Sequence, residues 1–263
     1  MRHKDRGMVY QQTIFNYLHL QMKNTTTIIF TACFLLFQPF HDSGSKKKII
    51  IVWQPSHQTD TGKDFSEAAT CNAIAEAAMK TKPHMKEYKV WSLGKEEYHH
   101  ADSGSNTKTE HTTAVIDGRI SGYAYELQQS NKLHPQVFIA VHNNGGTKRN
   151  AVWGYIHYGD QYENANRGLA ARLTKAISAA SGLEDRGIWL DSTTGRNDYR
   201  CQATGKLGFY SLDENINTAP YRVLLEIGDN AVSRELLLDP DSRKKIGEAI
   251  KKELVAWIKE KGL

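Results

Sequence analysis

The chain has 263 residues, 40% hydrophobic and 24% charged, which is enough for one full-sized core or for one domain with a short appendage. Its 34 Lys and Arg against 29 Asp and Glu give a net charge of +5, an excess too small to indicate a nucleic-acid-binding protein. With only 3 cysteines, a disulfide-rich scaffold is excluded. Cys71 and Cys201 either pair with each other or stay free.

The N-terminal 45 residues differ from the rest of the chain. Residues 25–40 (TTTIIFTACFLLFQPF) are uncharged and largely apolar, and basic residues precede them. This run is shorter than the roughly 20 apolar residues of a membrane-spanning helix and suits a signal peptide. We expect residues 1–45 to be a leader with a hinge, either a cleaved signal peptide or a retained membrane anchor, with its start at Met1 or Met22. The protein is then exported and is periplasmic, cell-envelope or secreted.

Residues 46–263 are expected to form the folded domain. Three unbroken apolar runs, at 49–53, 137–141 and 221–225, are typical of strands buried on both faces. Helical periodicity predicts helices at 67–80, 112–131, 164–181 and 242–261. The polar stretches 94–111 and 191–206 are expected to be surface loops bordering a groove. This alternation of strands and helices predicts an α/β sandwich.

Each of the three strands is followed closely by a residue that can bind a metal or move a proton. His57 follows the first strand, His142 the second and Glu226 the third, and Glu67 opens the first helix soon after His57. Parallel strands would bring all three strand ends to one edge of the sheet, where open α/β folds bind ligands. The loop before Glu67 is short enough to fold back over that edge.

The residue types indicate a catalytic zinc site. Imidazole nitrogens and a carboxylate oxygen are ligands that Zn²⁺ accepts, and three protein ligands leave a fourth position for water. We expect His57, Glu67 and His142 to hold Zn²⁺, and Glu226 to act as the general base. Taken singly, each residue has a simpler explanation, such as a hydrogen-bonded histidine or an acid in the first turn of a helix. The other histidines, His157 among them, are assigned to no site.

At these positions the chain resembles the zinc-dependent N-acetylmuramoyl-L-alanine amidases of the amidase-3 type. Their proline-glycine-histidine-glycine-glycine turn is similar to residues 55–59 (PSHQT), and their ligand glutamate to Glu67. Their second histidine segment resembles residues 140–144 (AVHNN), and their catalytic glutamate segment resembles 225–229 (LEIGD). The chain departs from the family pattern at the turn glycines and at Asp229, which stands where a phenylalanine is usual.

The resemblance implies a mixed, mostly parallel sheet with helices on both faces, of the zinc amidase/exopeptidase-like kind. It implies hydrolysis of the amide between N-acetylmuramic acid and L-alanine in peptidoglycan or a muropeptide. We expect a monomer that binds no nucleic acid. Two alternatives stay open. The altered turn around His57 motivates a zinc hydrolase acting on another peptide or amide bond, and the other alternative is a non-catalytic wall-binding module.

Overall fold

The structure is a computed structural model that describes residues 48–58, 61–91, 115–116, 119–120, 122–194 and 199–263. The expected leader, residues 1–45, and the expected loop at 94–111 lie outside these residues. Among the helices of the described part, none is both long and apolar enough to cross a membrane.

A six-stranded sheet forms the centre of the described domain, in the order β2-β1-β5-β8-β6-β7. Its strands are β1 (Ile50–Pro55), β2 (Lys86–Lys89), β5 (Val137–Asn144), β6 (Ala151–Ile156), β7 (Glu184–Leu190) and β8 (Tyr221–Asp229). All neighbouring pairs are parallel except β6 and β8, which are antiparallel. The predicted mixed, mostly parallel sheet is therefore confirmed. A separate pair, β3 (Val115–Ile116) and β4 (Arg119–Ile120), is antiparallel.

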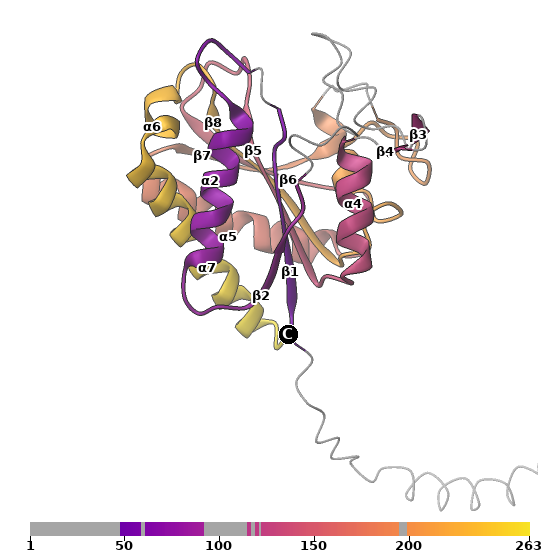
Figure 1. Cartoon of the computed structure of the whole chain (residues 1–263). Coiled ribbons are helices and arrows are strands. Elements are labelled where there is room, and N and C mark those ends of the chain that lie inside the picture. Colours follow the sequence, from indigo (N-terminus) through magenta and orange to yellow (C-terminus); the bar gives the residue numbers. More distant parts are fainter. Residues whose placement is uncertain (1–47, 59–60, 92–114, 117–118, 121, 195–198) are drawn as a thin grey trace, which may run out of the picture. The chain divides into compact units, whose positions relative to one another are not determined.

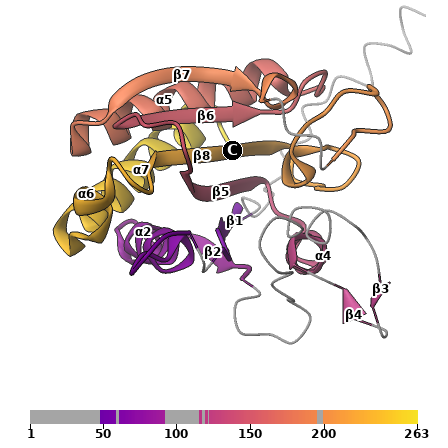
Figure 2. The same cartoon turned by 90° about the horizontal axis from the view of Figure 1, so that it is seen from above.

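Helices cover both faces of this sheet (Figures 1 and 2). The described helices are α2 (Glu67–Lys80), α4 (Gly122–Lys132), α5 (Glu163–Ser181), α6 (Arg234–Leu238) and α7 (Pro240–Glu260), with short 3-10 turns η1 (Asp191–Thr193) and η2 (Tyr210–Leu212). Apolar residues of α2, α5 and α7 form one layer of the core with one face of the sheet. Residues of α4 and η2 form the layer on the other face.

Local signals explain where the main helices begin and end. The side chain of Ser66 accepts the N–H of Ala69 and so caps the start of α2. Asp239 caps α7 in the same way, with Pro240 in the first turn, where proline's missing N–H costs nothing. Gly182 ends α5 in the left-handed conformation, at φ 77°, which glycine adopts without strain.

The crossing of α2 and α7 depends on Gly247. A Cβ at this position would lie 2.5 Å from the Ile74 carbonyl oxygen and 2.8 Å from the Ala78 nitrogen, both backbone atoms. The two helices therefore approach as closely as glycine allows. This approach holds α2 against the domain and sets the position of its first residue, Glu67.

Several predicted boundaries were wrong. The strands β5 and β8 continue beyond residues 141 and 225, so His142 and Glu226 lie within strands and not after them. The helix predicted at 112–131 begins only at Gly122, and the β3–β4 pair occupies described residues before it. The strands β2, β6 and β7 were not predicted, and the loop at 191–206 contains the turn η1.

Candidate active site

His142 and Glu226 lie directly opposite each other on the parallel strands β5 and β8. Residues two apart in a strand share a face, and the preceding members Ala140 and Leu224 belong to the core layer that α4 covers. The alternation therefore turns His142 and Glu226 toward the α4 side of the sheet. Only 6% of His142 and 9% of Glu226 is exposed, so both groups are largely shielded from bulk water.

Glu67 reaches the same edge of the sheet from the first turn of α2. The N–H of Glu67 donates to Thr61 Oγ1 at 2.9 Å, which fixes the start of the helix against the preceding loop. Its Oε1 lies 3.2 Å from His142 Nδ1, and its Oε2 accepts a hydrogen bond from Asn230 Nδ2 at 3.4 Å. The carboxylate of Glu67 is thus oriented toward His142 by a neighbour that follows β8.

His57 stands at the end of β1, beside β5. The N–H of Ser56 donates to the Val141 carbonyl at 2.8 Å, which keeps the chain alongside β5 up to His57. The His57 ring is fully buried, and its Nδ1 lies 3.1 Å from Glu126 Oε1. The other oxygen of Glu126 accepts Gln54 Nε2 at 2.8 Å. A carboxylate at Nδ1 orients the ring and directs Nε2 away from α4.

Glu126 contacts the candidate site and was not predicted from the sequence. It lies in α4, is fully buried and connects Gln54 of β1 with His57, which follows that strand. In the sequence it is one acid in a polar helical stretch (ELQQSNK), which is typical of a solvent-facing helix. Only the packing of α4 against the sheet reveals its contact with His57.

Asn143 and Cys71 are neighbours of the site residues, since Asn143 follows His142 in β5 and Cys71 lies one turn after Glu67 in α2. Asn143 Oδ1 accepts Thr70 Oγ1 at 2.5 Å, and its Nδ2 donates to the Ile227 carbonyl at 2.8 Å, so one side chain joins α2, β5 and β8. Burial raises the pKa of the Cys71 thiol well above its usual value, and the charges of Glu67 and Glu226 raise it further. Cys71 and Cys201 are both free and buried, so they do not pair.

The structure therefore gathers the four predicted residues at one edge of the sheet. His142 and Glu226 lie in the adjacent parallel strands β5 and β8, His57 follows the end of the neighbouring strand β1, and Glu67 opens the helix α2. Glu67 faces His142 directly, and Glu226 pairs with His142 across the strands. His57 is held separately, by Glu126.

A second buried cluster was not predicted. His157, Cys201 and Asp213 each offer a metal-binding atom, and these atoms lie within 4.8 Å of one another. Burial lowers the pKa of His157, but the hydrogen bond and charge of Asp191 outweigh this effect and raise it to about 9. In the sequence His157 stands alone, because its partners belong to a distant, polar segment.

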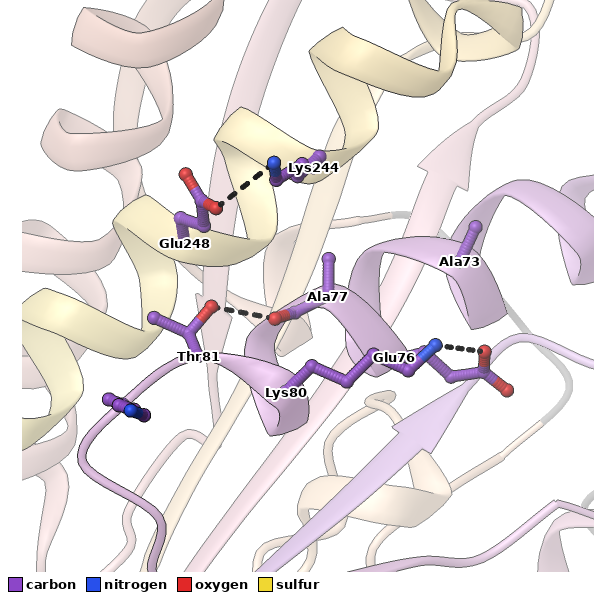
Figure 3. Close-up of a pocket in the computed structure, with 8 residues that line it drawn as sticks. Ala73, Glu76, Ala77, Lys80, Thr81, Lys244 and Glu248 are labelled. Carbon is purple, nitrogen blue, oxygen red and sulfur yellow. Dashed lines mark hydrogen bonds and ion pairs between the residues drawn. The ribbon is translucent and has the colours of Figure 1, made fainter.

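A surface hollow of about 560 Å³ lies between α2 and α7 and is separate from the candidate active site. Figure 3 shows its wall, where the pairs Glu76–Lys80 and Lys244–Glu248 run along the two helices. It borders residues 73–80 of α2 and the turn that follows them, whereas Glu67 is the first residue of that helix. The exposed ion pairs around it contribute little to stability.

Fold and site together define an α/β domain with buried histidines and carboxylates at the carboxyl edge of its parallel strands. Solved catalytic domains share this fold. CwlV, an N-acetylmuramoyl-L-alanine amidase from Bacillus (Paenibacillus) polymyxa var. colistinus, has 18% identity and a TM-score of 0.55, over 80% of this chain and 98% of that one. An N-acetylmuramoyl-L-alanine amidase from Clostridium difficile 630 has 14% identity and a TM-score of 0.55, over 82% and 99%. No curated protein sequence matches the chain.

The family model for N-acetylmuramoyl-L-alanine amidase (amidase-3) matches residues 103–256, more than half of the chain. The chain belongs to this family of hydrolytic enzymes. The matched region contains Glu126, His142 and Glu226, whereas His57 and Glu67 precede it. Their position near the same edge of the sheet comes from the structure.

Proposed function

We propose that the chain hydrolyses the amide between N-acetylmuramic acid and L-alanine in peptidoglycan, with Zn²⁺ held by His57, Glu67 and His142 and with Glu226 as the catalytic base. The activity is that of the family to which the chain belongs. The observation that carries the site assignment is the 3.2 Å approach of His142 Nδ1 to Glu67 Oε1 at a buried edge of the sheet.

The donor set fits zinc. Two ligands of one tetrahedral Zn²⁺, at bond lengths of roughly 2.0–2.2 Å, lie about 3.3 Å apart, close to the separation of His142 and Glu67. Glu126 at the Nδ1 of His57 is the carboxylate partner that metal-binding histidines usually have, because it fixes the tautomer and the ring direction. Two imidazoles and one carboxylate leave a coordination position open for chemistry.

The chemistry divides between the ion and the chain. A bound Zn²⁺ lowers the pKa of a water molecule to about 7 and polarises the scissile carbonyl. Glu226, opposite His142 on β8, accepts a proton from the attacking water and delivers it to the departing nitrogen. The carbonyl carbon gains a bond to the water oxygen as the C–N bond breaks. The products are the lactyl carboxylate of the glycan and a peptide with a free L-alanine amine.

Peptidoglycan as substrate supports an extracytoplasmic place of action. We infer that residues 46–263 are the catalytic domain and that residues 1–45 export it or anchor it to the membrane. A monomer is sufficient for the proposed chemistry, since every proposed site residue comes from one chain.

Digestion of purified peptidoglycan by the full chain tests this function. Mass spectrometry should find stem peptides with a free L-alanine N-terminus and glycan strands without peptides. Glu226→Gln, which keeps the size of the side chain but cannot take the proton, should produce both about 10²–10⁴-fold more slowly. Equal product yields from wild type and Glu226→Gln would overturn the assignment, and cleavage at another bond would overturn the substrate.

A further inference from the structure

His157, Cys201 and Asp213 form a compact set of three chemically different donors outside the amidase site. His157 follows β6, while Cys201 and Asp213 belong to the segment between β7 and β8. Exposure is 3% for His157 and 1% for each of the other two residues. One donor atom from each lies within 4.8 Å of the others. A buried thiol at this depth is out of reach of a polymeric substrate, so the cluster does not suit a nucleophile.

Asp191 holds the His157 ring in place. His157 Nδ1 donates to Asp191 Oδ2 at 2.6 Å, and the same carboxylate accepts the backbone N–H groups of Tyr158 and Phe209, both at 3.1 Å. The opposite ring nitrogen, Nε2, is buried and has no hydrogen-bond partner among the described residues. A carboxylate at one imidazole nitrogen and an open second nitrogen is the usual arrangement of a histidine that binds a metal.

Hydrogen bonds also hold the other two donors in place. Cys201 donates its N–H to the Lys206 carbonyl and accepts the Gly205 N–H, both at 2.9 Å, so its turn is closed by two hydrogen bonds. Asp213 Oδ2 accepts Tyr199 Oη at 2.5 Å, and Oδ1 accepts the backbone and side-chain nitrogens of Asn215. Each carboxylate oxygen can accept at two positions, so Oδ2 can still coordinate an ion.

We propose that His157 Nε2, Cys201 Sγ and the Asp213 carboxylate bind a second, structural divalent metal ion, with Zn²⁺ as the best fit. Sulfur, nitrogen and oxygen donors together suit this borderline-soft ion. Ligands of one such ion lie roughly 3.3–3.7 Å apart, so the donors draw together on binding. The ion ties the end of β6 to the segment that carries η1 and η2. This role is separate from amide hydrolysis.

Cobalt substitution separates the two sites, because only the second one contains a thiolate. Replacing zinc by Co²⁺ in the full chain should give a sulfur-to-cobalt charge-transfer band in the near ultraviolet. The proposed ligands His57, Glu67 and His142 supply no sulfur and give no such band. Cys201→Ser should abolish the band, while the matched variants Cys71→Ser and Cys33→Ser should keep it.

Metal analysis gives an independent readout. The zinc-loaded wild type should hold about two ions per chain and Cys201→Ser about one. A wild-type protein without the band overturns the second site, even if no variant folds. A band that persists in Cys201→Ser overturns it as well. Peptidoglycan cleavage is measured separately. The amidase assignment therefore stands if the second metal site is disproved, and the second metal site stands if the amidase assignment is disproved.

Discussion

His142 Nδ1 lies 3.2 Å from Glu67 Oε1, although one residue belongs to the central strand β5 and the other opens α2. Two elements far apart in the sequence thus present an imidazole and a carboxylate to the same buried point. The approach depends on α2 beginning at the sheet edge. There the Thr61 hydroxyl accepts the N–H of Glu67, and the Gln58 carbonyl accepts the N–H of Ala68. The His142–Glu67 pair supplies two of the three proposed zinc ligands.

Glu226→Gln should lower the amidase rate by about 10²–10⁴-fold, because proton transfer by a positioned carboxylate contributes that much. Zinc content should stay at the wild-type value, since Glu226 is not a proposed ligand. The matched control is Glu235→Gln on the exposed side of α6, which should keep full activity. A large loss of zinc in Glu226→Gln would instead make it a ligand.

Glu126→Gln tests the positioning of His57. The amide cannot accept from both His57 Nδ1 and Gln54 Nε2, as the carboxylate does, so the ring loses its fixed direction. We expect the zinc concentration that half-activates the enzyme to rise by about 10–100-fold, while the rate at saturating zinc falls much less. The exposed control Glu248→Gln should change neither quantity. A fall in the saturated rate alone would contradict a positioning role.

Asp229 should make stability depend on pH. Burial raises its pKa, but the hydrogen bonds from Thr147 and from the N–H groups of Ala231, Val232 and Lys148 prevail and lower it. A carboxylate with a lowered folded-state pKa stabilises the protein above its unfolded pKa, about 3.9, and loses this contribution as pH falls through the folded value.

Asp229→Asn leaves buried donors without their acceptor and should cost about 1–3 kcal/mol at pH 7. Urea unfolding at pH 7 and at pH 3 should show that the difference from wild type shrinks in acid. Asp64→Asn is the control, because Asp64 is exposed and asparagine tolerates its φ of 53°. A difference that is equal at both pH values would contradict the ionised role of Asp229.

Two glycine-to-alanine changes in helices should have opposite effects on the stability of the domain. Gly247→Ala places a Cβ against the backbone of α2 and should destabilise the domain by about 1–3 kcal/mol. Gly168 in α5 is exposed and has no atoms within 4 Å of an added Cβ, so Gly168→Ala should stabilise by up to about 1 kcal/mol. Thermal unfolding measures both. Stabilisation by Gly247→Ala would show that the helices cross less closely.

Sequence patterns predicted the strands whose two faces are both buried. The apolar runs of β1, β5 and β8 stand out because helices cover both sides of the central strands. The edge strands β2 (KEYK) and β7 (EDRGIWL) are largely polar and partly exposed, and so resemble loops. The ends of β5 and β8 were misplaced because His142 and Glu226 interrupt the apolar run while strand pairing continues.

The four site residues could be proposed from the sequence because each follows a predicted apolar run or opens a predicted helix. Glu126 could not, since its contact with His57 depends on how α4 packs on the sheet. The same holds for His157, whose partners Asp191 and Cys201 lie in a segment predicted only as a polar loop. Local patterns place residues on elements, but they do not show which distant side chains meet.

Crystallographic anomalous scattering at the zinc absorption edge, measured on the active, zinc-loaded protein, tests the central claim most directly. A peak within coordination distance of His57, Glu67 and His142, with Glu226 beside it but not bound, is the predicted result. Active protein whose zinc lies elsewhere, for example only among His157, Cys201 and Asp213, would contradict the proposed catalytic site.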